Sequence, residues 1–305
     1  MSFASETKTE LCKTTPQNSC CQKAECYGLL LFGRCFSNHI ITITTENSAA
    51  AHRAAQLTAE TAGAIVDIST SLLRRKERKS AFTVTVNGED QRERVLSFFG
   101  HTGGEISLRI NRANIENDCC AGAFLRGVFL SCGTVTDPQK DYHLEFVVPF
   151  MNLAKDLSAL ISEVFELNLH VGVLNRKGSF VVYIKGSEGV ADLLTYMGAG
   201  NAAMELMQAK MLKEVRNNVN RKTNFETANI DKTAQAAAEQ GIAIEKILSS
   251  TGISALPEEL QELAMLRYRN PEMSLRELGQ ALSEPLSRSG INHRLQRIVE
   301  FAKEL

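Results

Sequence analysis

Two stretches of the sequence, "CCQKAECYGLLLFGRCF" at Cys20–Phe36 and "CCAGAFLRGVFLSCGTV" at Cys119–Val135, repeat one pattern 99 residues apart. A cysteine pair, an alanine, a glycine and a leucine recur in the same register in both copies. Small residues stand four apart, at Ala24 and Gly28 in the first copy and at Ala123, Gly127 and Ser131 in the second. Because residues four apart share one helix face, each copy predicts a helix with a smooth stripe. We expect the two helices to pack with their backbones close together.

The repetition continues beyond these helices, which indicates two copies of a unit of about 100 residues. Alternating apolar residues, the pattern of a half-buried strand, follow at residues 40–45 and 81–86 in the first copy and at 143–148 and 179–184 in the second. Helical patterns accompany these strands at residues 50–63 and 92–99, and at 151–165 and 190–196. Each copy therefore predicts helix, strands, helix, strands and helix, which is an α+β architecture.

The bulk composition excludes several classes of protein. A chain of 305 residues with 44% hydrophobic residues can fill two or three cores. Its net charge of −1 leaves any binding of nucleic acid to local patches of charge. The first nineteen residues hold no apolar signal segment, and no later stretch approaches the roughly 18 uncharged apolar residues of a membrane span. We therefore expect a cytoplasmic protein with no membrane partner.

The eight cysteines of a chain without a signal segment are expected to be buried thiols rather than disulfides. The adjacent pairs Cys20-Cys21 and Cys119-Cys120 lack the two-residue spacer that is typical of a zinc site. The scarce histidines supply no matching second half of such a site. The sequence therefore predicts no metal site and no cofactor.

From Pro257 onward the pattern changes to three short helices separated by turns. Pro257 suits the first turn of one helix, Ser274 and Glu277 form a capping box for the next, and the last helix begins near Ser287. Apolar residues at helical spacing predict the inward faces: Leu260, Leu263 and Leu266; Leu275, Leu278 and Leu282; and Ile291, Leu295, Ile298 and Ala302. Such an arrangement is a helix-turn-helix, an all-α domain whose last helix reads the major groove of DNA.

The outer face of that last helix is short, polar and locally basic. The candidate DNA-binding residues on or beside this face are Ser287, Arg288, Ser289, Asn292, His293, Arg294 and Arg297. Arginine can pair with guanine and asparagine with adenine, so Arg288, Asn292 and Arg294 are the candidates for reading bases. The alternative is an ordinary solvated helix face, because glutamates at positions 258, 259 and 262 dilute the positive charge.

Between the repeats and these helices, the pattern predicts two more helices, at Ala202–Val219 and Asp231–Leu248. The intervening "NRKTNFETAN", Asn220–Asn229, is either a simple loop whose Asn229 caps the next helix, or a segment that contacts DNA phosphates. In the second case the candidate DNA-backbone contacts are Arg221, Lys222 and Asn224. The basic run "RRKERK" at Arg74–Lys79 has the same two interpretations, a solvated segment or a DNA contact.

The double repeat resembles the LAGLIDADG homing-endonuclease fold, with "CYGLLLFGR" and "LRGVFLSCG" in the register of the nine-letter motif. The resemblance implies a central pseudo-twofold pair of helices, and two sheets that form a saddle over DNA. In that family an acidic residue at the eighth letter binds the divalent metal for phosphodiester cleavage. Here these lost metal-ligand positions are Gly33 and Cys132, and neither offers a hard oxygen ligand. We therefore expect no catalytic residues and no enzyme activity.

A degenerate LAGLIDADG repeat followed by a helix-turn-helix resembles the WhiA family over nearly the whole chain. The resemblance lies in "FLRGVFLSCGTVTDPQKDYHLEF", "NNVNRKTNFETANIDKTAQAAAEQ" and "SLRELGQALSEPLSRSGINHRLQRI", with a more distant match at "SFASETKTEL". WhiA proteins are bacterial DNA-binding regulators linked to sporulation, cell division and chromosome segregation. The resemblance implies a sequence-specific transcriptional regulator that binds double-stranded DNA at promoters, and it assigns DNA reading to "SRSGINHR" at Ser287–Arg294.

These expectations divide the chain into a double repeat at residues 1–200, with copies at about 16–105 and 115–200, a helical linker at 201–255 and a helix-turn-helix at 256–305. Binding to chromosomal DNA implies a nucleoid-associated, cytoplasmic protein. Two other functions stay open. One is an interaction module for division or segregation, in which the saddle holds a transcription or division protein while the helix-turn-helix contacts DNA nonspecifically. The other is an active site-specific endonuclease.

Overall fold

The computed structural model of the chain describes residues 2–16, 18–73, 79–164 and 169–305. It divides into two compact units, residues 1–213 and 214–305. The first unit contains both repeats, and the second contains the carboxyl-terminal helices. Each unit has a hydrophobic core of its own.

Each repeat folds into the same succession of elements, which confirms the predicted α+β double repeat. The first copy comprises α2 (Ser19–Leu31), β1 (Cys35–Phe36), β2 (Ile41–Thr45), α3 (Ser48–Ala62), β3 (Val66–Leu73), β4 (Lys79–Val86) and α4 (Glu89–Phe98). The second comprises α5 (Asp118–Cys132), β5 (Gly133–Val135), β6 (His143–Val148), α6 (Met151–Val164), β7 (Val171–Arg176), β8 (Ser179–Lys185) and α7 (Ser187–Met197). Helix α1 (Phe3–Leu11) precedes the first copy, and the 3-10 helix η1 (Arg112–Asn114) lies between the copies.

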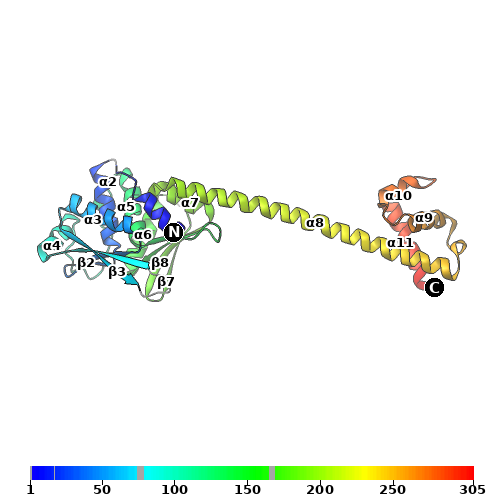
Figure 1. Cartoon of the computed structure of the whole chain (residues 1–305), viewed down its shortest axis with the longest axis horizontal. Coiled ribbons are helices and arrows are strands. Elements are labelled where there is room, and N and C mark those ends of the chain that lie inside the picture. Colours follow the sequence, from blue (N-terminus) through cyan, green and yellow to red (C-terminus); the bar gives the residue numbers. More distant parts are fainter. Residues whose placement is uncertain (1, 17, 74–78, 165–168) are drawn as a thin grey trace. The chain divides into compact units, whose positions relative to one another are not determined.

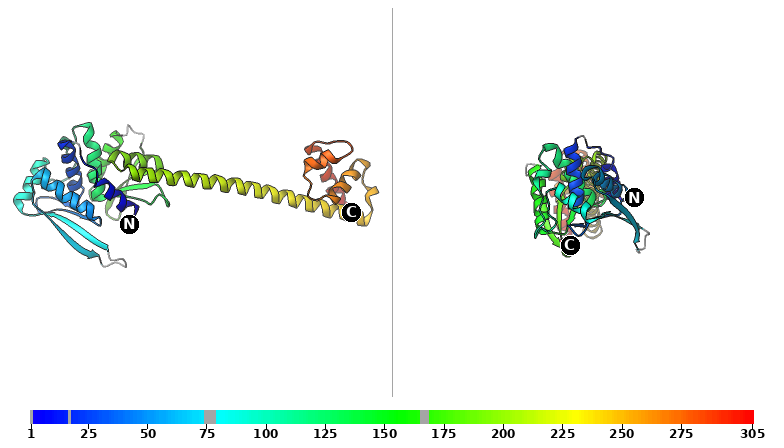
Figure 2. Two further views of the ribbon diagram at one scale, coloured as in Figure 1. Left: turned by 45° about the horizontal axis from the view of Figure 1, so that its top comes forward. Right: turned by 90° about the vertical axis from the view of Figure 1, so that its left-hand side faces the viewer.

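The two sheets are antiparallel and have the same topology. Their strand orders are β1-β2-β4-β3 and β5-β6-β8-β7. Helix α3 packs on β2, β3 and β4, and helix α6 packs on β6, β7 and β8. Figures 1 and 2 show these helices beside the central helices α2 and α5, with the sheets beneath them. The first unit is therefore a layer of helices on a pair of sheets, as the LAGLIDADG resemblance implies.

Strands β3 and β7 are elements that the periodicity did not predict. Residues 67–71 of β3 and residues 173–176 of β7 are exposed, so neither strand shows the alternation of a half-buried strand. Each lies at the edge of its sheet and pairs only with the strand that follows it, β4 or β8. In the β7–β8 hairpin, Lys177 and Gly178 form a two-residue turn with φ of 54° and 82°.

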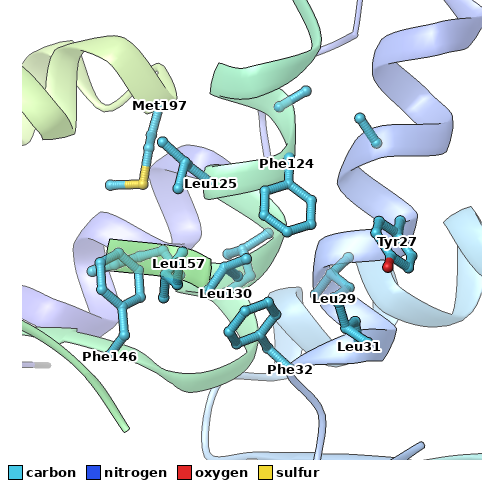
Figure 3. Close-up of a cluster of buried hydrophobic side chains, with 14 of the residues drawn as sticks. Tyr27, Leu29, Leu31, Phe32, Phe124, Leu125, Leu130, Phe146, Leu157 and Met197 are labelled. Atoms are coloured by element: carbon cyan, nitrogen blue, oxygen red, sulfur yellow. The ribbon is translucent and has the colours of Figure 1, made fainter. Parts of the chain in front are cut away.

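Helices α2 and α5 pack against each other at their glycines, as the small-residue stripe predicts. A Cβ at Gly28 would lie 2.4 Å from the carbonyl oxygen of Phe124, and a Cβ at Gly127 would lie 2.1 Å from that of Glu25. Glycine is therefore required at both positions for the backbones to approach so closely. Figure 3 shows Tyr27 of α2 and Phe124 of α5, whose ring centroids lie 5.7 Å apart.

A buried ion-pair network joins this helix pair to its neighbours. The carboxylate of Glu25, which is fully buried, accepts hydrogen bonds from Nε of Arg53 at 2.9 Å and from Nε of Arg126 at 3.0 Å. Arg126 also donates to the carbonyl oxygen of Met197 at 2.8 Å. The two arginines stabilise the buried carboxylate, and the network connects α2, α3, α5 and α7.

The same packing brings the two cysteine pairs together at the amino-terminal ends of α2 and α5. The sulfur atoms of Cys20, Cys21, Cys119 and Cys120 all lie within 4.8 Å of one another. The two pairs, one from each repeat, therefore lie side by side, which the spacing within each pair did not indicate. The spacing typical of a zinc site applies to two cysteines on one segment, whereas these two pairs belong to two different helices. The expectation of buried thiols holds for Cys21, Cys26 and Cys120, whereas Cys119 is exposed.

Helix α8 (Gly200–Ser250) is one helix of 51 residues. The prediction of two helices with a loop at Asn220–Asn229 is wrong, and Asn229 lies inside the helix instead of capping one. Residues 201–240 contain neither glycine nor proline, and asparagine has only a modest helix penalty. The local tendency of asparagine to cap or turn is therefore too weak to interrupt the helix.

The second unit contains the carboxyl-terminal part of α8, the 3-10 helix η2 (Ile253–Ala255) and three helices, α9 (Glu258–Arg269), α10 (Leu275–Ala281) and α11 (Arg288–Glu304). Ile244 and Ile247 of α8 join its core. Among the helices that the structure describes, none combines the length and the apolar character of a bilayer-spanning segment.

Candidate nucleic-acid interface

Helices α9, α10 and α11 form the predicted helix-turn-helix around one apolar core. Most of the residues predicted to face inward are buried: Leu260, Leu263, Leu278, Leu282, Ile291, Leu295, Ile298 and Ala302. Leu266 and Leu275 are half-buried against the same core. The helical spacing therefore predicted the inward face of each helix correctly, and it left the opposite face of α11 to solvent.

The turn that leads into α11 is tight because Gly279 allows the chain to fold back over it. The backbone N–H of Leu286 donates to the carbonyl oxygen of Gly279 at 3.0 Å. A Cβ at position 279 would lie only 2.3 Å from the carbonyl oxygen of Leu286. Ser287 then caps α11, where its side chain accepts a hydrogen bond from the N–H of Gly290 at 3.2 Å. These contacts determine where α11 begins.

Polar contacts also fix α9 and α10. The predicted capping box is present, since Glu277 N donates to Ser274 Oγ at 3.3 Å and Ser274 N donates to Glu277 Oε2 at 2.8 Å. The backbone N–H of Ser274 holds the pKa of Glu277 below its usual value. Arg267, which is buried, donates to Gln240 Oε1 at 2.8 Å and to the carbonyl oxygen of Met273 at 2.6 Å. The framework beneath α11 is thus held by hydrogen bonds as well as by apolar packing.

The amino-terminal half of α11 presents polar side chains to solvent. Arg288, Ser289, Asn292 and His293 are all exposed. Arg288 and Asn292 are four residues apart and therefore lie on one helix face, separated by about 6 Å along the axis. Ser287 uses its oxygen as the cap acceptor and keeps its hydroxyl hydrogen for a donor role. This half of the helix can offer donors and acceptors to base edges and phosphates.

Two of the candidate arginines have partners within the unit. Arg294 Nη1 donates to the carbonyl oxygen of Glu259 at 3.0 Å, and Arg297 Nη1 donates to Glu259 Oε1 at 2.5 Å. The hydrogen bond from Arg297 lowers the pKa of the Glu259 carboxyl. Arg294 and Arg297 are half-buried and connect α11 to α9. The pairing joins positions 38 residues apart, so helical periodicity alone did not indicate it.

The candidates for DNA-backbone contacts lie along α8. Arg221, Lys222 and Asn224 are exposed, as is every residue from position 214 to position 236. Arg221 and Asn224 are three residues apart and share one face, while Lys222 lies about 100° around the helix. Of the other basic segment, Arg74–Lys79, residues 74–78 lie outside the described residues, and the side chain of Lys79 does as well.

The lost metal-ligand positions lie at the carboxyl-terminal ends of α2 and α5. Gly33 and Cys132 line one hollow together with Thr44 and Val147. Burial raises the pKa of the Cys132 thiol to about 12, so this thiol is protonated at neutral pH. The positions that bear carboxylates in the nucleases thus offer a glycine and a neutral thiol.

A lysine side chain lies close to the same end of the helix pair. Nζ of Lys8, on α1, donates to the carbonyl oxygen of Leu130 at 3.1 Å, and burial lowers the pKa of this lysine. In the adjoining hollow, which Lys8 and Cys132 both line, Glu46 is the only carboxylate among the described lining residues. Mg²⁺ prefers several oxygen ligands, so these side chains do not form the paired-carboxylate site that such an ion needs.

Comparison with known proteins identifies the family of this chain. Curated relatives named "Probable cell division protein WhiA" are 36% identical over 310 residues in Ruminiclostridium cellulolyticum and 38% identical over 316 residues in Clostridium botulinum. These alignments cover 100% of this chain and 98% and 99% of the relatives. The chain belongs to the WhiA family. Family models match as well, the WhiA LAGLIDADG-like domain at residues 121–216 and the WhiA C-terminal HTH domain at residues 219–302.

Solved WhiA structures have the same fold. The crystal structure of full-length DUF199/WhiA from Thermotoga maritima superimposes with a TM-score of 0.62 at 26% identity, and covers 100% of this chain and 99% of that one. The amino-terminal LAGLIDADG domain of DUF199/WhiA gives a TM-score of 0.52 at 20% identity, over 64% of this chain and 90% of that domain. The WhiA HTH match includes both the α11 candidates and the α8 candidates.

Proposed function

We propose that this member of the WhiA family is a non-catalytic, sequence-specific DNA-binding protein that regulates transcription in cell division. The proposal rests on the exposed Arg288 and Asn292 at the amino-terminal end of α11, the last helix of a helix-turn-helix. The names of the curated relatives support the role in cell division. The same proposal includes chromosome segregation, sporulation in hosts that sporulate, binding at promoters, and a cytoplasmic, nucleoid-associated location.

Each candidate residue has a proposed part in binding. Arg288 and Asn292 read bases in the major groove, because a helix of this motif contacts base edges near its amino terminus. Ser287, Ser289 and His293 flank them and contact the sugar-phosphate backbone.

Arg294 and Arg297 connect α11 to α9 through Glu259. We therefore propose that their main role is to position α11, and that contact with DNA is secondary. Arg221, Lys222 and Asn224 on α8 are proposed to contact phosphates. These assignments fit the proposed division into residues 1–200, 201–255 and 256–305, in which the double repeat is a scaffold.

The absence of catalysis is proposed from the donor atoms at the ends of α2 and α5. Gly33 has no side chain, the Cys132 thiol is neutral, and the Lys8 side chain lines the adjoining hollow. We expect no Mg²⁺-dependent cleavage of plasmid or genomic DNA. Cleavage that a carboxylate substitution such as Glu46→Gln abolishes would restore the endonuclease alternative.

The test of sequence-specific binding is a pair of variants on one helix. Genomic fragments that the full-length protein selects are measured by fluorescence anisotropy at a fixed salt concentration. Arg288→Ala is expected to weaken binding to the selected site by about 1–3 kcal/mol, because one bidentate base contact is lost. Lys303→Ala is the matched control, since it removes a positive charge from the exposed carboxyl-terminal end of α11. Equal affinity of Arg288→Ala and the control for the selected site would refute base reading by Arg288.

A protein-interaction role is the second candidate, and one observation favours it. Val215, Val219, Phe225 and Ile230 expose apolar side chains on α8, as a partner-binding helix does. A transcription or division protein that binds there would leave the helix-turn-helix to hold DNA nonspecifically. Mapping of chromosomal occupancy separates the two functions. Discrete peaks at promoters support regulation, whereas diffuse occupancy supports the interaction module.

A further inference from the structure

Four thiols from two distant parts of the chain converge at the amino-terminal ends of α2 and α5. Cys20 and Cys21 lie in the first turn of α2, and Cys119 and Cys120 lie at the equivalent positions in α5. Sγ of Cys20 lies 3.7 Å from Sγ of Cys119, and all four sulfur atoms lie within 4.8 Å of one another. In the described residues, this is the group that could hold a metal ion.

The distances between the sulfurs fit one tetrahedral ion. A zinc–thiolate bond of about 2.3 Å in a tetrahedral site implies sulfur–sulfur separations of about 3.8 Å. The Cys20–Cys119 separation of 3.7 Å already has this value, and it is much longer than a disulfide bond of about 2.05 Å. The most distant pair of sulfurs needs to approach by about 1 Å, which small side-chain rotations can provide.

The helix ends and the solvent exposure at this position both bear on metal binding. Both helices begin here, so the positive ends of two helix dipoles face the cluster. The N-cap residues Asn18 and Asn117 make no side-chain cap hydrogen bond, and Nδ2 of Asn18 instead approaches Sγ of Cys119 at 3.9 Å. Cys21 and Cys120 are buried whereas Cys119 is exposed, so the cluster has both a protected side and a path from solvent.

We propose that Cys20, Cys21, Cys119 and Cys120 bind a single zinc ion that joins the two repeats. Four thiolates in a tetrahedron select a soft ion such as zinc and disfavour magnesium. Binding releases the four thiol protons to solvent and changes no oxidation state. The ion lies at the end of the helix pair opposite Gly33 and Cys132, so it is structural and separate from the lost nuclease positions.

The zinc site does not depend on the DNA-binding proposal, and its test measures metal content. Full-length protein is purified without chelator, exchanged into metal-free buffer, and analysed for zinc, iron and copper by mass spectrometry. We expect about one zinc per chain. Cys119→Ser is expected to lower the affinity for zinc, measured by chelator competition, by at least ~10-fold. Far-UV circular dichroism of Cys119→Ser checks that the variant is folded, as expected for a substitution at an exposed position.

Cys35→Ser is the matched control, because Cys35 lies on β1, beyond the other end of α2. It is expected to retain the zinc content and affinity of the wild-type protein. Substitution of cobalt for zinc gives a second readout, since tetrahedral cobalt thiolates absorb strongly in the visible range and the Cys119→Ser variant should lose this absorption. Three results would overturn the proposal. These are equal zinc affinity of wild type and folded Cys119→Ser, iron in place of zinc, or a Cys20–Cys119 disulfide in the protein kept under reducing conditions.

Discussion

At the scale of single residues, the double repeat depends on two glycines and one buried ion-pair network at the contact between α2 and α5. Gly28 and Gly127 let the two helix backbones approach each other closely. A Cβ added at either position would lie within 2.4 Å of a carbonyl oxygen. Glu25 is acceptable in the same interface because Arg53 and Arg126 both donate to it. The sequence pattern indicated the glycines, since both copies share them. It did not indicate the ion pairs, because Glu25 and Arg126 are 101 residues apart.

Gly127→Ala tests the close contact of the helices. The added methyl group would lie 2.1 Å from the carbonyl oxygen of Glu25, and both groups belong to packed backbones, so the helices must separate. We expect a loss of about 1–3 kcal/mol in the free energy of unfolding, measured by urea denaturation. Gly241→Ala in α8 is the control, since no atom lies within 4 Å of its added Cβ. It should increase stability by about 0.5–1 kcal/mol. Equal effects of the two substitutions would contradict the packing described here.

Glu25→Ala tests the buried ion pairs. It leaves two arginines in the interface without their shared carboxylate, and the free energy of unfolding should fall by about 3–5 kcal/mol. Glu163→Ala provides the comparison, because the pair between Glu163 and Arg112 is largely exposed, with side-chain exposures of 61% and 48%. That substitution should cost less than about 1 kcal/mol. A loss below 1 kcal/mol for Glu25→Ala as well would show that the network adds little to stability.

At the scale of elements, α11 and α8 differ in how well the sequence predicted them. The capping box and the apolar spacing together predicted the helix-turn-helix and its exposed face. The asparagines of residues 220–229 indicated a turn, yet they continue α8 as one helix. Helix formation is cooperative, so a few residues of moderate propensity inside a long favourable segment remain helical. Edge strands β3 and β7 were missed because they form through pairing and not through a buried face.

The salt dependence of binding tests the proposed phosphate contacts of α8. Each lost phosphate contact should reduce the slope of log K against log salt concentration by about 1. The double variant Arg221→Ala with Lys222→Ala should therefore reduce the slope by about 2 and weaken binding to selected and unrelated DNA alike. Lys303→Ala serves again as the control. An unchanged slope would show that these α8 residues lie away from the DNA.

At the scale of the whole molecule, the residues that the structure describes form two hydrophobic cores that share no buried residue. The first core holds α1 to α7, the sheets and the start of α8, and the second holds the end of α8 with the helix-turn-helix. Residues 214–236 of α8 are all exposed, so they add little apolar burial to either core. Residues that are buried in one core unfold together. Because the two units share no core, we expect them to unfold separately.

Differential scanning calorimetry of two single variants tests this independence. Gly127→Ala should lower the transition temperature of the double repeat alone. Leu295→Ala removes a fully buried side chain from the second core and should destabilise that unit by about 2–5 kcal/mol without moving the other transition. A single transition that both substitutions shift together would show that the units are thermodynamically coupled.

The sequence by itself determined the repeat, the α+β class and the helix-turn-helix, because each follows from local spacing or residue chemistry. Only the tertiary structure decided which distant side chains meet. It pairs Glu259 with Arg294 and Arg297, buries Glu25 between two arginines, and gathers four cysteines at one end of the helix pair. Periodicity shows which face of an element turns inward, whereas packing decides which residues face each other across that interface.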